Sequence, residues 1–276
     1  MIKSFLRINT PIDSLLIKAF NELLPLVPTE IIPYMSHPSE SGETPQRRRI
    51  GEVFGSMPHP HIPGMNISVG VVDLTRMRAE GGDPEAQFQY AVMCQNGRVI
   101  QQDQEQARSW LRKAAAQGHV KAMFNLGVTY GDGLGVPVDD AEAFKWYQAA
   151  ANEGDPRAHF NLGSFYIDGR GTPIDGAKAN EHWFEAALRG MSLAQVRLAL
   201  SFARGDGGRV DHQLAFIWAY VSKDKEANAR LILDAITQAI SAEEVAALER
   251  EAHGVIQQMG SISPDDKRRF SKGDEP

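Results

Sequence analysis

Apolar residues in the central part of the chain recur at helical spacing, and the whole pattern returns every 36 residues. Four aligned alanines define position 0 of four repeats: Ala86, Ala122, Ala158 and Ala194. Position +4 of each repeat is a large apolar residue: Tyr90, Leu126, Leu162 and Leu198. Position +8 is Cys94, Tyr130, Tyr166 and Phe202. This spacing predicts one helix per repeat, from about position −2 to about position +9.

Glycine and aspartate mark where each predicted helix ends and where a second one begins. Position +11 is always glycine: Gly97, Gly133, Gly169 and Gly205. Position +17 is always aspartate: Asp103, Asp139, Asp175 and Asp211. Glycine is common just after a helix, and aspartate is a favoured N-cap. We therefore expect a second helix from position +17 to about +30, ended by the glycine that three repeats have at +32. Asp83-Pro84 and Asp155-Pro156 are N-cap and first-position signals for two first helices.

Two features predict that the second helix packs closely on the first. Gly127 and Gly163 lie at position +5, inside the first helix, where each costs about 1 kcal/mol relative to alanine. Such a cost is tolerated when a neighbouring helix packs against the bare backbone. Near position +24 three second helices have a tryptophan: Trp110, Trp146 and Trp218. In the third repeat the tryptophan, Trp183, comes one place later. Each repeat is thus expected to be an antiparallel helix pair with a tryptophan anchor.

The second repeat has the most complete pattern: Ala122, Leu126-Gly127, Tyr130, Gly133, Gly135-Val136, Asp139, Ala143, Trp146, Ala150-Ala151 and Gly154. This pattern resembles the Sel-one-like repeat (SLR), a relative of the tetratricopeptide repeat. The resemblance covers about residues 82–223. It implies an all-α fold, a right-handed α/α solenoid of about four helix pairs, which serves as a scaffold or adaptor between proteins. The expected repeats are 83–118, 119–154, 155–190 and 191–223.

The segments outside the repeats are predicted to be an amino-terminal extension, helices that cap the two ends of the stack, and a carboxy-terminal tail. In residues 1–66 the sequence predicts a short amphipathic helix over 11–24 and a linker rich in Pro, Ser, Gly and His. The helix either folds back onto the solenoid or binds a partner or a membrane surface. Residues 67–82 resemble a lone second helix that caps the stack. Residues 224–260 are expected to form helices that cap the other end, with a capping box at Ser241 to Glu244, and 261–276 a disordered tail.

Composition narrows the range of functions. The net charge of −6 over 276 residues does not favour nucleic-acid binding. The sequence has a single cysteine, Cys94, which excludes an intramolecular disulfide. It stands at position +8, where the other repeats have an aromatic residue, and this predicts that it is buried. The most apolar amino-terminal stretch, 15–27, contains Lys18 and Glu22 and is too short to span a membrane. With no signal peptide recognisable, a cytoplasmic location is expected.

The sequence has little that indicates catalysis. It contains no phosphate-binding glycine loop, no nucleophile elbow and no paired-cysteine metal motif. Ser222 and Lys225 match the S-x-x-K of penicillin-interactive enzymes, although the companion motifs are missing. His37, His59 and His61 lack carboxylate or cysteine partners nearby. We therefore expect no enzymatic activity, no cofactor and no metal.

The resemblance to tetratricopeptide-like stacks implies that first helices line a concave groove which holds a partner. The candidate contacts lie at positions −1, +3 and +10 of the repeats: Gln89, Lys121, Asn125, Asp132, Arg157, Asn161, Asp168 and Arg197. Amide side chains pair with a peptide backbone, and the cations suit a carboxylate. The alternative is that these are solvated positions on half-buried helices.

The functional hypothesis is therefore an adaptor that binds a protein or peptide segment, in a bacterial regulatory or secretion-linked role. Two alternatives remain at this point. One is an immunity-type protein that neutralises a cognate toxin, and the other is a hydrolase or penicillin-interactive enzyme that uses Ser222 and Lys225.

Overall fold

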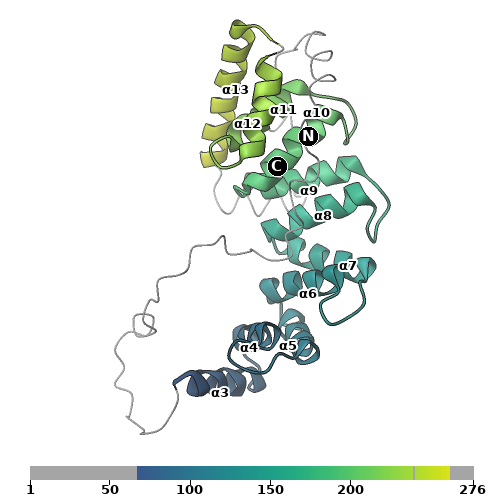
Figure 1. Ribbon diagram of the computed structural model, residues 1–276, viewed down its shortest axis with the longest axis vertical. Coiled ribbons are helices and arrows are strands. Elements are labelled where there is room, and N and C mark those ends of the chain that lie inside the picture. Colours follow the sequence, from purple (N-terminus) through teal and green to yellow (C-terminus); the bar gives the residue numbers. More distant parts are fainter. Residues whose placement is uncertain (1–66, 239, 262–276) are drawn as a thin grey trace. The chain divides into compact units, whose positions relative to one another are not determined.

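The computed structural model describes residues 67–238 and 240–261, and every regular element in these ranges is an α-helix (Figure 1). The amino-terminal extension 1–66, with the predicted helix 11–24, lies outside the described residues, as does the tail from residue 262. The described residues fall into two compact units, 67–122 and 123–261. Each unit is described by itself below.

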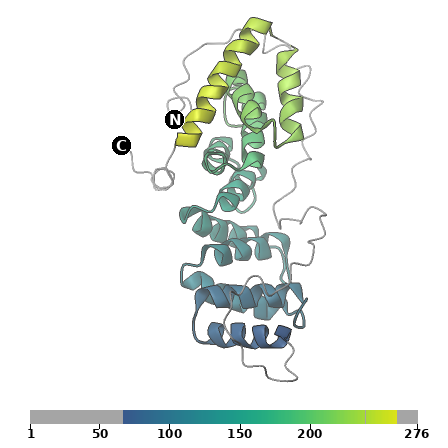
Figure 2. The same ribbon diagram turned by 90° about the vertical axis from the view of Figure 1, so that its left-hand side faces the viewer.

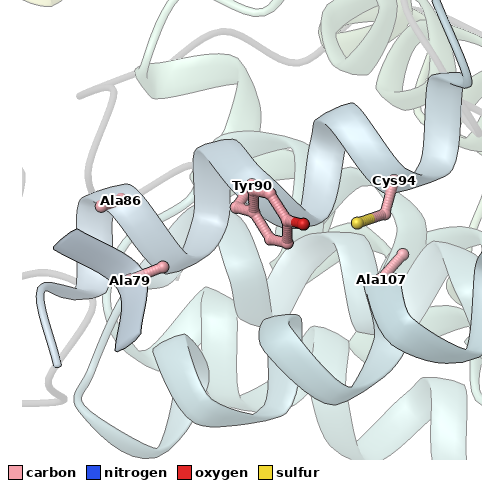
Figure 3. Packing of buried hydrophobic residues seen from close by; sticks show 5 residues of the cluster. All are labelled: Ala79, Ala86, Tyr90, Cys94 and Ala107. Carbon is pink, nitrogen blue, oxygen red and sulfur yellow. The ribbon is translucent and has the colours of Figure 1, made fainter. Parts of the chain in front are cut away.

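The first unit contains three complete helices: α3 (Ile67–Glu80), α4 (Pro84–Asn96) and α5 (Gln104–Ala116). Helix α4 packs against both α3 and α5. The core of the unit is built from Tyr90, Cys94 and Ala107, together with Ala79 and Ala86 (Figure 3). Cys94 is fully buried, which confirms the prediction from its column, and its Sγ–H donates to Gln106 Oε1 at 3.1 Å. Burial raises the pKa of this thiol to about 11.

The second unit begins within α6 (Val120–Asp132) and continues through seven more helices: α7 (Asp140–Asn152), α8 (Pro156–Asp168), α9 (Gly176–Leu188), α10 (Ser192–Arg204), α11 (His212–Ser222), α12 (Ala227–Thr237) and α13 (Ala242–Ser261). From α7 to α11 each helix packs against the next one in the chain (Figure 2). Helices α4, α6, α8 and α10 are the predicted first helices, and α5, α7, α9 and α11 the second helices. The expected all-helical repeat fold is confirmed.

The helix ends form where the sequence predicts them. Asp83 and Asp155 accept hydrogen bonds from the first-turn amides of α4 and α8, with proline at the start of each helix. The aspartates at position +17 cap all four second helices in the same way. The +11 glycines that end three of the first helices have positive φ: 63° at Gly97, 68° at Gly169 and 77° at Gly205. A residue with a Cβ rarely adopts this conformation, which explains the glycine column.

The bare backbone inside a first helix is covered by one aromatic ring from its own second helix. A Cβ added to Gly127 would lie 2.5 Å from Tyr147 Cδ1, and one added to Gly163 would lie 2.5 Å from Trp183 Cδ1. Both rings stand at position +25 of their repeats. Trp183, which comes one place later than the other tryptophans, therefore stands at the position that faces the glycine, and His182 fills position +24.

Helices α12 and α13 cover the end of the second unit. Both pack on α11, and their buried residues are apolar: Ala229, Ile232, Ala235, Ile236, Leu248, Ala252 and Val255. The predicted capping box is confirmed, because Ser241 N donates to Glu244 Oε2 at 2.8 Å and Glu244 N donates to Ser241 Oγ at 3.3 Å. Of the described helices, none is long and apolar enough to cross a membrane.

We predict that Gly163→Ala lowers the free energy of unfolding by about 1–3 kcal/mol, because the new methyl group overlaps the Trp183 indole. Adding Trp183→Leu should recover part of the loss, since the first repeat has Ala91 and Leu111 at the same two positions. Urea unfolding measures both effects.

Gly254→Ala is the matched control. This glycine also lies inside a helix, α13, but a Cβ there meets no heavy atom within 4 Å. The substitution should therefore stabilise the protein, by up to about 1 kcal/mol. An equal gain at Gly163 would show that the ring does not restrict that position.

Candidate functional site

The candidate partner contacts in residues 123–261 come from the first helices α6, α8 and α10. Asn125, Arg157 and Arg197 are each half-buried, while Asp132 and Asp168 are exposed at the carboxyl ends of α6 and α8. We call these five residues the first-helix face. Much of the remaining surface of α8 and α10 is buried, so Arg157 on α8 and Arg197 on α10 are among the few polar side chains accessible on these helices.

Arg157 is held in place by groups of two neighbouring helices. Its Nε and Nη2 donate to the Asp155 carboxylate at 3.1 and 2.6 Å. The guanidinium carbon lies 4.2 Å from the centre of the Phe124 ring on α6. Asp155 also caps α8, and its side chain is almost fully buried. The cation is therefore preorganised at the junction of α6 and α8, where part of its charge is already balanced.

Asn161 corrects the expected contact set. Its side chain is 0% exposed, so it touches no partner in this conformation. Neither Oδ1 nor Nδ2 has a hydrogen-bond partner in the described structure. An unpaired buried amide of this kind costs free energy that an exposed groove residue does not. Position +3 is thus accessible in α6 and α10 and enclosed in α8, a difference that the repeat pattern does not show.

Gln89 and Lys121 lie in the other unit, and both are exposed. Gln89 Nε2 donates to Glu85 Oε1 at 2.8 Å, and His119 Nε2 lies 3.0 Å from Glu85 Oε2. These two hydrogen bonds lower the pKa of Glu85, and the charge of Lys121 adds to the effect. The His119 ring also stacks on Phe88. The amide of Gln89 is therefore engaged within the chain rather than free for a partner.

Sequence reasoning missed Arg170, which joins two successive repeats. Its Nε donates to Asp140 Oδ1 at 2.8 Å, and its Nη2 donates to the carbonyl of Gly131 at 2.9 Å. The guanidinium also lies 4.6 Å from the centre of the Phe165 ring. Because Arg170 stands in the turn of the third repeat and its partners belong to the second, it fixes the turn against the preceding helix pair. A lone arginine in a glycine-rich turn gave no signal of this role.

Of the residues considered for catalysis and metal binding, Ser222 and Lys225 lie in the described part of the chain. Ser222 is 0% exposed, and its hydroxyl donates to the carbonyl of Trp218 at 2.9 Å. His37, His59 and His61 lie outside the described residues. Within 67–238 and 240–261, no group of three or more His, Cys, Asp or Glu side chains is placed to hold a metal ion.

The repeats match a known family model over about half of the chain. The model is that of the Sel1 repeat, and it matches residues 84–119, 120–155, 156–191 and 192–222. The chain belongs to the Sel1 repeat family. Repeats of this kind generally mediate contacts between proteins.

Two solved structures show the same fold. One is c5321, a protective antigen present in uropathogenic Escherichia coli strains that displays an SLR fold, with TM-score 0.60 and 26% identity over 75% of this chain and 44% of that one. The other is a Sel1 repeat protein from Oxalobacter formigenes, with TM-score 0.55 and 34% identity over 59% of this chain and 48% of that one. This chain thus spans less than half of either protein. A comparison with curated proteins finds no match.

The third Sel1 repeat contains a pair of adjacent histidines that the other repeats lack, of which His159 is buried and His182 half-buried. His159 Nδ1 and His182 Nδ1 are 3.0 Å apart, and the His182 ring stacks on Tyr166 at 5.5 Å. Burial, His182 and Arg189 lower the pKa of His159 to about 3, and burial and Lys178 lower the pKa of His182 to about 4. At neutral pH both rings are therefore uncharged, and one donates to the other. His182 stands in the tryptophan column, so this break in the column is the signal that marks the site.

We predict that acid destabilises this Sel1 repeat protein through the histidine pair. In the unfolded chain both imidazoles bind protons near pH 6.5, whereas in the folded chain they do so only near pH 3 and 4. Their contribution is therefore complete above pH 6.5 and is lost progressively as the pH falls towards 4, because the unfolded chain binds protons there that the folded chain does not. Urea unfolding between pH 7 and pH 4 measures it.

The double variant His159→Gln with His182→Trp should have a flatter pH dependence, because it introduces residues that other repeats have at these positions. His253→Gln, which replaces an exposed histidine of α13, is the control and should leave the slope unchanged. Identical slopes in the double variant and the parent would contradict the assignment.

Proposed function

We propose that this Sel1 repeat protein is a non-enzymatic adaptor that binds a segment of a partner protein on the first-helix face. The observation that carries the proposal is that Asn125 and two half-buried cations, Arg157 and Arg197, lie on helices of one unit. Of the two cations, Arg157 is preorganised by its contact with Phe124. An amide and guanidinium groups suit a partner segment with accessible backbone groups and acidic side chains.

The preorganisation of Arg157 supports this proposal energetically. Binding normally costs the ordering of long side chains, about 0.5–1.5 kcal/mol for each one that is immobilised. The Asp155 carboxylate and the Phe124 ring already restrict Arg157, so a partner pays little of this cost. The exposed carboxylates of Asp132 and Asp168 at the ends of the same helices disfavour an acidic segment there. The expected partner is therefore acidic where it meets positions −1 and +3.

Burial of Ser222 supports the non-enzymatic part of the proposal. A nucleophilic serine needs access to its substrate and a base that takes its proton. Ser222 instead directs its hydroxyl to the backbone carbonyls of Trp218 and Ala219, which is the usual bond of a serine within a helix. A cytoplasmic, bacterial role in regulation or secretion is the setting that we propose for the adaptor.

We predict that Asn125→Ala weakens binding of the partner about tenfold, the loss expected for one hydrogen bond of about 1–1.5 kcal/mol. The partner is first isolated by affinity capture with the full chain and identified by mass spectrometry. Its dissociation constant is then measured by titration calorimetry against the parent and the variant.

Asn152→Ala is the matched control, because Asn152 is an exposed asparagine on a second helix, α7. It should leave the affinity unchanged, and circular dichroism should show the same helicity in both variants. If Asn125→Ala binds as tightly as the parent, the first-helix face is the wrong surface.

A further inference from the structure

Helix α3 has the sequence and the contacts of a second helix. Counted back by one repeat, Ala79 stands in the column of Ala115, Ala151 and Ala187, and all four are buried. Gly82, with φ 94°, stands in the column of three glycines with φ 84°: Gly118, Gly154 and Gly190. Gln87 donates to the carbonyl of Ala79 at 3.1 Å, and Gln195 donates to the carbonyl of Ala187 at 3.3 Å. Helix α3 is thus related to α4 as α9 is to α10.

The side of α3 that would face its own first helix has two exposed apolar residues beside a buried threonine, Thr75. In the complete repeats position +21 is an alanine with 0% exposure: Ala107, Ala143, Ala179 and Ala215. A Cβ added to Gly131 of α6 would lie 3.5 Å from the Ala143 methyl, so this position faces the repeat's own first helix. On α3 the same position is Val71, which is 40% exposed, and position +24 is Leu74, which is 54% exposed. Met77, on the same helix, is 62% exposed.

The sequence one repeat length upstream fits the missing helix. Ile50, Phe54 and Gly55 fall at positions 0, +4 and +5, where the complete repeats have alanine, a large apolar residue, and alanine or glycine. In the first complete repeat the residues at +4 and +24 touch, since the Tyr90 and Trp110 rings are 5.8 Å apart, edge to face. A helix in the same register would bring Phe54 to Leu74 and Gly55 to Thr75.

We propose that residues 48–57 dock on the Val71 and Leu74 side of α3 as the first helix of a fifth, amino-terminal repeat. Pro58, at position +8, ends this helix earlier than in the other repeats, because a proline disfavours helical backbone before it. The docked segment buries the apolar face of α3, as the end of a helical stack requires. The amphipathic segment 11–24 is a less suitable occupant, since it lies out of register and a much longer loop must close.

Hydrogen exchange of the full-length protein, read by mass spectrometry, tests the proposal. The amides of residues 50–57 should exchange at least about tenfold more slowly than expected for an unstructured chain. Leu74→Glu places a charge on the docking side of α3 and should remove this protection while α4 and α5 stay protected. Leu231→Glu, which changes a similarly exposed leucine on α12, is the control and should leave residues 50–57 protected.

Three results would overturn the proposal. Residues 50–57 could exchange at the unstructured rate in the parent protein. Leu74→Glu could release residues 11–24 instead, which would make that segment the occupant. Finally, Leu74→Glu could convert a dimer into a monomer in sedimentation experiments, which would assign the face to a second copy of the chain.

Discussion

The packing of one aromatic ring on a stretch of bare helix backbone sets the geometry of the central repeats. Tyr147 on Gly127 and Trp183 on Gly163 bring the two helices of a pair so close that no Cβ fits between them. The first and fourth repeats have the opposite combination, alanine at +5 with Leu111 or Ala219 at +25. A large ring thus goes with glycine, and a smaller side chain goes with alanine, so no repeat places a bulky ring against a Cβ at this contact.

This close approach explains why the other columns are fixed. The turn between the two helices must reverse the chain within a few residues, which the left-handed glycines and the aspartate caps of position +17 allow. Interactions that cross from one repeat to the next are of a different kind. Arg170 reaches back to Asp140, and Gln195 reaches back to Ala187 as Gln87 does to Ala79, whereas the second and third repeats have Met123 and His159 in place of this glutamine. Each helix pair is built alike, whereas neighbouring pairs are joined individually.

The difference between these two kinds of contact explains what could be predicted. Helix pairs, caps and turns follow from residues that recur at fixed spacing, and the sequence alone was sufficient for them. The sequence did not predict which of the adjacent positions +24 and +25 faces the glycine. Successive residues of a helix point in directions about 100° apart, so a shift of one position changes which side chain faces the neighbouring helix. The burial of Asn161 and the pairing of His159 with His182 depend on neighbouring helices, which no single column describes. For the same reason, the sequence identified Arg157 as a candidate contact but not its fixation by Phe124.

The central functional claim is that the partner lies on the first helices of residues 123–261, and photo-cross-linking tests it most directly. A photoreactive amino acid is placed at position 125 of α6 in one protein and at position 145 of α7, where Lys145 is exposed, in another. We expect the bound partner to be cross-linked from position 125 and not from position 145. Cross-linking from position 145 alone would contradict this claim, because the partner would then lie on the second helices.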